Sequence, residues 1–232
     1  MADLRRHLIA VLVGWLPVAG WAQAERPGER RLEFTVFSAQ PITGLAYSAR
    51  AEGKPRPLAF YPTARSPQYS YAGPATVQFL DARSGTVAAE VIVPPEIRMA
   101  LFIFSPVNSP APGAPRYQVM VVDDSQGQHA PGKLRVLNYS GLALSGTINR
   151  HPVVLPEGAN GPFESGTTAV IELRTPFRDR SYRALATTLS LAPGDRGLLL
   201  LLPPYRPGSL EVQSRMLVDA PPSSPTKLGD RE

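Results

Sequence analysis

The sequence contains no cysteine, and this absence excludes several kinds of stabilisation and chemistry. None of the 232 residues is a cysteine. The folded chain therefore has neither disulfide bonds nor reactive thiols, and its stability must come from hydrophobic cores. A typical structural zinc cluster is excluded as well, because the few histidines cannot supply its ligands without cysteine. We expect no metal ion and no cofactor.

Histidine is also scarce, which weakens the case for a hydrolase. The chain has three histidines, and one of them, His129, lies in a polar Gly/Pro segment. A Ser-His-Asp triad needs a histidine to move the proton. The sequence has no Gly-x-Ser-x-Gly elbow, and Ser224-Pro-Thr-Lys227 matches the Ser-x-x-Lys pattern by coincidence. We predict that the protein is not an enzyme, with an exported hydrolase of unfamiliar design as an alternative.

Charge of one sign is not concentrated anywhere along the chain. The sequence has 24 Lys and Arg against 19 Asp and Glu, a net charge of +5. Its arginines stand singly between apolar runs, and no aromatic-rich basic stripe accompanies them. The one local group is Arg174, Arg178, Arg180 and Arg183. We therefore predict no nucleic-acid partner.

Residues 1–24 have the organisation of a secretory signal peptide. Arg5 and Arg6 give a positive start, an apolar run follows over 8–20, and Ala22-x-Ala24 supplies the small residues that signal peptidase requires. The run is too short to cross a bilayer as a stable helix. We expect cleavage after Ala24 and an exported protein, periplasmic or extracellular, with no integral membrane span.

Beyond residue 31 the apolar residues come in short runs of strand length. Pro, Gly, Ser or Asp separates the runs, and this spacing is typical of an all-β protein. The 26 prolines support the same interpretation, because proline breaks helix interiors. The strands expected in the first half are 32–37, 44–48, 58–61, 75–80, 87–93, 99–104 and 117–122.

Four short segments of the chain recur in the same order, with offsets of about 92 to 98 residues. The pairs are 44–48 with 136–140, 71–80 with 164–173, 94–104 with 192–202, and 121–123 with 217–219. Each repeat is long enough to close a two-sheet sandwich.

We predict an all-β fold of two tandem immunoglobulin-like β-sandwich units. Unit one covers 32–125 and unit two covers 133–219, and a disordered tail follows over 220–232. The alternative is one larger β-sandwich that both repeats form together.

The second repeat carries a recognisable set of structural motifs. Arg135-Val-Leu-Asn-Tyr-Ser140 opens it, a Gly-initiated strand covers 166–173, and Pro193-Gly194 precedes the apolar strand at 198–202. Over 134–219 these features resemble an uncharacterised family of bacterial exported immunoglobulin-like β domains, and unit one resembles it only loosely. The resemblance implies a fold and an envelope location, and it implies no ligand.

Aromatic side chains are the remaining candidates for a binding site. Tyr61, Tyr69 and Tyr71 flank a Pro/Ser-rich stretch, and tyrosine rings stack on sugars and on protein partners. Asp123 and Asp124 are interpreted as a solvated strand end rather than a calcium site. We predict a non-catalytic envelope protein with a structural or protein-interaction role. The alternative is a carbohydrate-binding module that uses the three tyrosines, so the expected partner is another envelope protein or a polysaccharide.

Overall fold

The computed structural model describes residues 29–50, 53–111 and 113–219. The predicted signal peptide and C-terminal tail lie outside these ranges. All regular elements of the described residues are β-strands, and none of these residues is helical, which confirms the all-β prediction. The described part of the chain accordingly offers no helix that could span a membrane.

Each unit contains eight strands. Unit one consists of β1 (Arg30–Ser38), β2 (Leu45–Ser48), β3 (Pro55–Pro57), β4 (Tyr69–Gly73), β5 (Thr76–Asp81), β6 (Val87–Ile92), β7 (Met99–Pro106) and β8 (Tyr117–Asp123). Unit two consists of β9 (Lys133–Asn138), β10 (Leu144–Ile148), β11 (His151–Leu155), β12 (Gly158–Glu164), β13 (Thr168–Phe177), β14 (Arg180–Ser190), β15 (Arg196–Leu202) and β16 (Gln213–Asp219).

The two units have the same strand order. The sheets of unit one run β4-β1-β7-β8 and β3-β2-β5-β6, and those of unit two run β12-β9-β15-β16 and β11-β10-β13-β14. Every strand of unit two therefore takes the place of the strand eight positions earlier. In both units the first strand pairs in parallel with the seventh, β1 with β7 and β9 with β15. The topology of unit one is thus repeated in unit two.

This order differs from that of a constant-type immunoglobulin domain. Such a domain has seven strands, with A, B, E and D in one sheet and C, F and G in the other. Each unit here has two four-stranded sheets, and its first strand lies between the fourth and the seventh. The all-β fold with two sandwich units is observed, whereas the finer immunoglobulin-like assignment stays a prediction.

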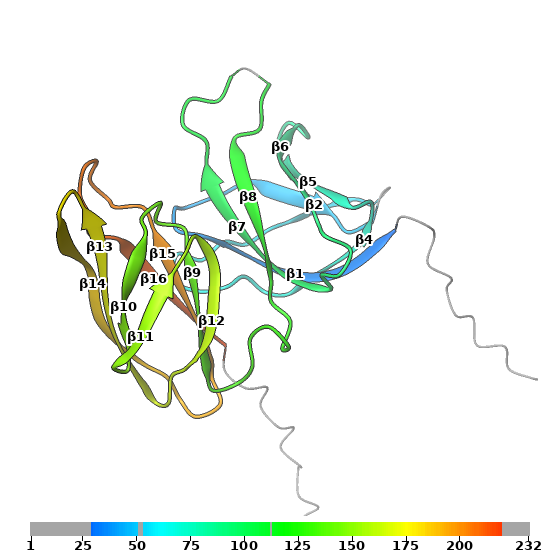
Figure 1. The fold of residues 1–232 in the computed structure, drawn as a ribbon. Coiled ribbons are helices and arrows are strands. Elements are labelled where there is room, and N and C mark those ends of the chain that lie inside the picture. The colour runs from blue at the N-terminus through cyan, green and yellow to red at the C-terminus, as the bar shows by residue number, and fades with distance from the viewer. Residues whose placement is uncertain (1–28, 51–52, 112, 220–232) are drawn as a thin grey trace, which may run out of the picture.

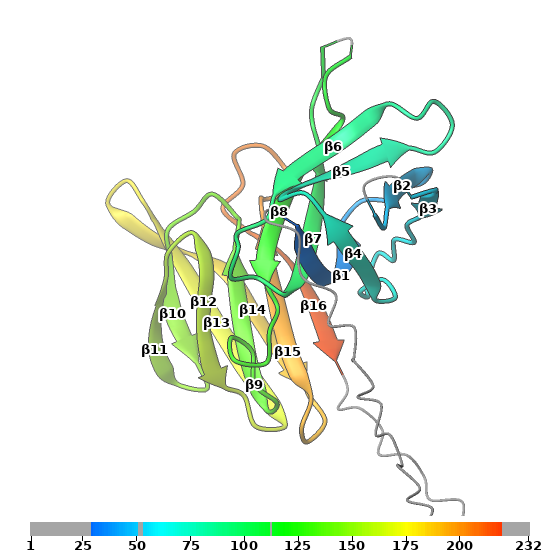
Figure 2. The same cartoon turned by 90° about the vertical axis from the view of Figure 1, so that its right-hand side faces the viewer.

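Three hydrophobic clusters hold the four sheets in one stack. The first cluster fills unit one and includes Phe34, Phe79 and Phe102, and the second fills unit two and includes Ile171 and Leu199. The third cluster lies between the units, where β1, β7 and β8 face β9, β15 and β16 (Figures 1 and 2). Its buried members are Phe37, Leu101, Ile103, Val122, Leu137, Leu198, Leu200 and Leu217.

Strands β7 and β15 lie at the centre of the stack, and each is buried on both faces. Leu199 and Leu201 of β15 point into the core of unit two, while Leu198 and Leu200 point at unit one. A strand that is covered on both faces is a continuous hydrophobic run, because it has no solvent side. Strand β13, which belongs to the other sheet of unit two, instead alternates: Ile171 is buried, and the adjacent Val170 and Glu172 are exposed.

Two of the sequence-based assignments are wrong. The segment 136–140 was matched with 44–48, but the topology makes β9 the counterpart of β1 rather than of β2. Residues 58–61 form no strand, although Leu58 is buried and Phe60 packs against the core. Apolar side chains on a covering loop give the same local pattern as a short strand.

Candidate functional site

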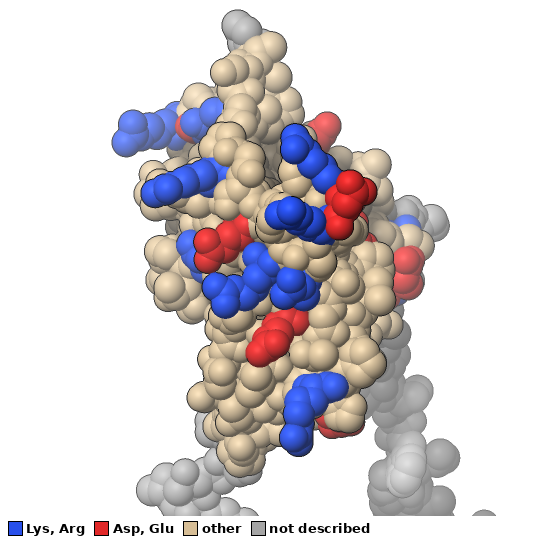
Figure 3. All heavy atoms as spheres, turned by 60° about the vertical axis from the view of Figure 1, so that its left-hand side comes forward, with Lys and Arg blue, Asp and Glu red and all other residues tan. Residues whose placement is uncertain are grey.

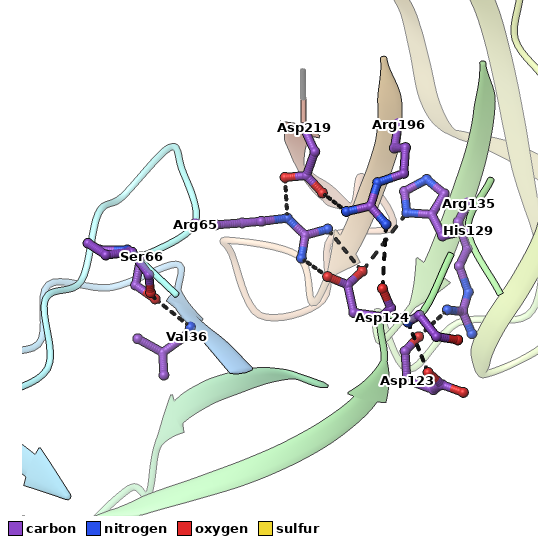
Figure 4. A network of polar contacts seen from close by, with 11 residues as sticks. Val36, Arg65, Ser66, Asp123, Asp124, His129, Arg135, Arg196 and Asp219 are labelled. Carbon is purple, nitrogen blue, oxygen red and sulfur yellow. Dashed lines mark hydrogen bonds and ion pairs between the residues drawn. The ribbon is translucent and has the colours of Figure 1, made fainter. Parts of the chain in front are cut away.

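Buried charged residues gather where the two units meet, at the edge of the apolar contact between them. Five side chains from both units lie close together there, and Figure 4 shows how they face one another. We call them the junction cluster: Arg65, Asp124, His129, Arg196 and Asp219.

Arg65 reaches the junction because its loop is held along β1. The backbone nitrogen of Ser66 donates to the carbonyl of Val36 at 3.0 Å, and the nitrogen of Val36 donates to Ser66 Oγ at 2.7 Å. These bonds attach a segment without regular structure to a central strand. The Arg65 side chain, which is only 8% exposed, is thereby directed toward unit two.

Arg65 contacts a carboxylate from each unit. Its two terminal nitrogens bind Asp124 in unit one, with Nη1 to Oδ2 at 2.5 Å and Nη2 to Oδ1 at 3.2 Å. Its Nε lies 2.8 Å from Oδ1 of Asp219, the last residue of β16 in unit two. Asp219 Oδ2 also accepts a hydrogen bond from Arg196 at 2.8 Å. The Arg65–Asp219 pair joins the two units, whereas the bidentate Arg65–Asp124 pair lies within unit one and the Arg196–Asp219 pair within unit two. Charge assistance makes such hydrogen bonds strong.

A further polar contact joins the units beside this cluster. Arg135 Nη1 of β9 donates to the backbone carbonyl of Asp123 at 2.5 Å. The prediction that Asp123 and Asp124 form a solvated strand end is wrong for Asp124, which is buried and ion-paired. Its position directly after an apolar strand could not reveal a partner that is 59 residues away.

His129 is enclosed beside these ion pairs. Its side chain is fully buried, and neither ring nitrogen has a hydrogen-bond partner among the described residues. Nδ1 lies 4.0 Å from Asp124 Oδ1. Burial lowers the pKa of His129, the Asp124 carboxylate acts in the opposite direction, and Arg196 and Arg65 lower the pKa further. The ring is therefore neutral at pH 7, because the ordinary pKa of histidine is already about 6.5.

The cluster is suited to fixing the two units rather than to proton transfer. Two arginines and two aspartates balance each other in charge, and Arg65 and Arg196 occupy the oxygens of both carboxylates. Breaking such a buried pair is strongly destabilising, because the remaining charge is left without a partner. Within the described ranges no group of three or more His, Cys, Asp or Glu residues is placed to hold a metal ion.

The three predicted tyrosines do not share an exposed face. Tyr61 is 45% exposed on the loop before β4, whereas Tyr71 is buried and donates its hydroxyl hydrogen to the carbonyl of Pro74 at 2.9 Å. Tyr69 is half-buried, packs against Phe34, and accepts a hydrogen bond from the backbone nitrogen of Ala59. Tyr69 and Tyr71 lie on the same side of β4, as alternation predicts, and that side faces the core.

The Asn-x-Ser motif of β9 has a structural role. Asn138 is fully buried and donates from Nδ2 to the carbonyls of Leu142 and Leu155, at 3.0 and 2.8 Å. Its Oδ1 accepts a hydrogen bond from Ser140 Oγ at 2.6 Å. These bonds close the turn after β9, and the buried Asn138 agrees with its placement in a buried strand.

The local arginine group lies on the β13–β14 hairpin at the outer side of unit two. Arg174 donates to Ser181 across the hairpin, from Nε at 3.1 Å and from Nη2 at 2.6 Å. Figure 3 shows Lys and Arg side chains interspersed with Asp and Glu on this side of the molecule. The surface of the hairpin is therefore of mixed charge.

Sequence reasoning did not find the junction cluster. Arg196 and Asp219 belong to repeated segments, so their recurrence was an available signal. Arg65 had no such signal, because it stands in a Pro/Ser-rich loop whose partners lie far away in the sequence.

No family model matches the chain, and neither does any curated protein sequence. The functional proposal therefore depends on the chain's own residues.

Proposed function

We propose that the protein is a non-catalytic interaction module of the bacterial cell envelope, whose two β-sandwich units act as one rigid body toward a protein partner. The observation that supports this proposal is the way the units are joined. An apolar cluster from six strands, the Arg65–Asp219 ion pair and the hydrogen bond from Arg135 to the carbonyl of Asp123 hold them together. Domains move relative to each other by default unless their interface is large and hydrophobic. A fixed orientation allows one partner to contact both units at once.

The export signal and the resemblance of unit two to exported β domains support the envelope location. The signal is the charged start, the short apolar run and Ala22-x-Ala24. A protein of the envelope that lacks cysteine needs another way to fix two domains, and the junction cluster offers one.

Crosslinking in the native cells, followed by mass spectrometry of the co-purified material, tests the proposal. The wild type is compared with Asp219→Ala, which removes the carboxylate between Arg65 and Arg196. Asp81→Ala is the matched control, since Asp81 is paired with Arg116 inside unit one and its side chain is equally exposed, 20% in both cases.

We expect one protein partner to be recovered with the wild type and with Asp81→Ala, and less of it with Asp219→Ala, whose folding is checked by circular dichroism. Undiminished recovery with Asp219→Ala would contradict the need for a fixed orientation. Turnover by the purified protein on a panel of esters, glycosides and phosphates would contradict the non-catalytic role.

A further inference from the structure

A hollow of about 520 Å³ opens in unit one, at the end where β1 begins. Figure 1 shows this end of the unit, with β4 and the start of β1, on the side away from unit two. Its volume falls within the range of small-molecule sites, about 300–1,000 Å³. Four of the side chains that line it are arginines from four separate segments: Arg31, Arg50, Arg56 and Arg98.

Backbone hydrogen bonds bring these segments together. The nitrogen of Ala72 in β4 donates to the carbonyl of Ala49 at 2.8 Å, and Arg50 forms an isolated bridge with Ala72. The nitrogen of Glu33 in β1 donates to the carbonyl of Arg98 at 2.9 Å. The backbones of Arg31, Arg50 and Arg98 are therefore fixed around the hollow before any ligand binds. This lowers the entropic cost of binding.

Among the described residues, the side chains that line the hollow carry an excess of positive charge. Its lining includes one carboxylate, Glu33, so the four arginines leave a net charge of +3. No ion pair links any of the four to a carboxylate within the described ranges, whereas Arg65 and Arg196 at the junction are both paired. All four are exposed. Guanidinium groups bind carboxylates, phosphates and sulfates through paired hydrogen bonds.

The other residues that line the hollow indicate which kind of anion it can bind. The half-buried Ala72 and Met99 supply apolar surface, and Ser70 and Glu33 supply oxygen atoms that can bond to hydroxyl groups. The one aromatic residue of the lining, Tyr71, is 7% exposed and keeps its hydroxyl on Pro74. Single-stranded nucleic acids need exposed aromatic faces for base stacking, so they fit this hollow poorly.

We infer that this hollow binds an acidic oligosaccharide through the carboxylates of its sugar rings. Arginines on several sides suit a ligand with more than one charge, while the apolar surface accommodates the C–H faces of the rings. Glu33 and Ser70 accept hydrogen bonds from sugar hydroxyls. This inference rests on the proposed binding role and adds a ligand class and a second contact surface to it.

Isothermal titration calorimetry of the full chain with a galacturonic acid tetrasaccharide tests the inference. The ligand controls are the fully methyl-esterified tetrasaccharide, which lacks the charges, and inorganic phosphate. The protein variants are the double substitution Arg31→Gln/Arg98→Gln and the control Arg180→Gln/Arg183→Gln. The control removes the same charge from the exposed β13–β14 hairpin. Melting temperatures verify that both variants fold.

We expect the acidic tetrasaccharide to bind the wild type, and the affinity to fall at least tenfold in Arg31→Gln/Arg98→Gln and less than twofold in the control variant. Neither the methyl ester nor phosphate should bind comparably. Equal losses in both variants would indicate unspecific charge attraction, and comparable phosphate binding would indicate a simple anion site. Either result, or no binding at all, would overturn the inference.

The same samples separate this inference from the proposed function. Chromatography after incubation should show the tetrasaccharide at its original length. Shortened products from a bound ligand would contradict the non-catalytic role while leaving the site in place. Conversely, a protein partner recovered by crosslinking without any glycan binding would refute the site and leave the proposed function standing.

Discussion

At the scale of single residues, Arg65 is paired with a carboxylate of its own unit and with one of the other unit. Its side chain binds Asp124 and Asp219, and only 8% of it is exposed. We expect Arg65→Met to lower the free energy of unfolding by about 3 kcal/mol, because Asp124 is left buried without its partner. Chemical denaturation measures this change.

Arg116→Met is the matched control for this substitution. Arg116 also pairs at 2.5 Å with an aspartate of unit one, Asp81, but 48% of its side chain is exposed. Pairs at the surface contribute little, because water and salt screen them. We expect this variant to unfold at nearly the same denaturant concentration as the wild type. An equal loss in both variants would contradict the special role of the junction.

His129 predicts how stability depends on pH. Its pKa in the folded protein is lowered, chiefly by burial, so the unfolded chain takes up a proton first as the pH falls. Stability from this group is complete above pH of about 6.5 and decreases below it, by at most about 1.4 kcal/mol per pH unit. Denaturation curves between neutral and mildly acidic pH measure the slope.

Two histidine variants isolate this effect. His129→Gln should flatten the slope below the ordinary histidine pKa, because the group that titrates on unfolding is gone. His151→Gln should leave it unchanged, since His151 is exposed at the start of β11. A slope that survives in His129→Gln would show that other groups cause it.

The sequence could indicate which residues are buried more readily than it could indicate their partners. Asn138 lies in a buried strand, and the apolar residues around it in the sequence indicate that strand. Arg65 and His129 stand in polar, proline-containing segments and still end up buried. Their burial comes from contacts between units, and no local pattern of the chain encodes those contacts.

At the scale of elements, Gly146 allows β10 and β13 to lie close together. A Cβ at this position would lie 2.0 Å from the carbonyl oxygen of Glu172, which belongs to the backbone of the neighbouring strand and cannot easily move. We expect Gly146→Ala to lower the free energy of unfolding by about 1–3 kcal/mol, because the two strands must separate.

Gly127→Ala serves as the comparison for that substitution. A Cβ there would meet only Ser125 Oγ, at 4.0 Å. Thermal unfolding of both variants should therefore show a lower melting temperature for Gly146→Ala alone. Similar melting temperatures for the two variants would contradict the close approach of β10 and β13.

Most strands could be predicted from their apolar runs. The same runs also contain a signal that indicates which sheets stack on each other. The segments 99–104 and 198–202 are apolar throughout rather than alternating, which indicates burial on both faces. Each observed strand there divides its side chains between a unit's own core and the contact with the other unit. Strand order was beyond reach, because pairing such as that of β1 with β7 joins segments with no shared local signal.

At the scale of the whole molecule, we expect the two units to unfold as one cooperative unit. The apolar contact between them contains Phe37 and Leu101 from unit one and Leu198 and Leu200 from unit two. Unfolding either unit alone would expose this surface of the other to water and would break the Arg65–Asp219 ion pair. The energetic link between the units is therefore expected to be strong.

Differential scanning calorimetry of the full chain shows whether the two units unfold together. We expect one transition, with calorimetric and van't Hoff enthalpies whose ratio is about one, as a two-state unit requires. Two separate transitions, or a ratio of about two, would show that the sandwiches unfold independently and would contradict the proposal that they act as one rigid module.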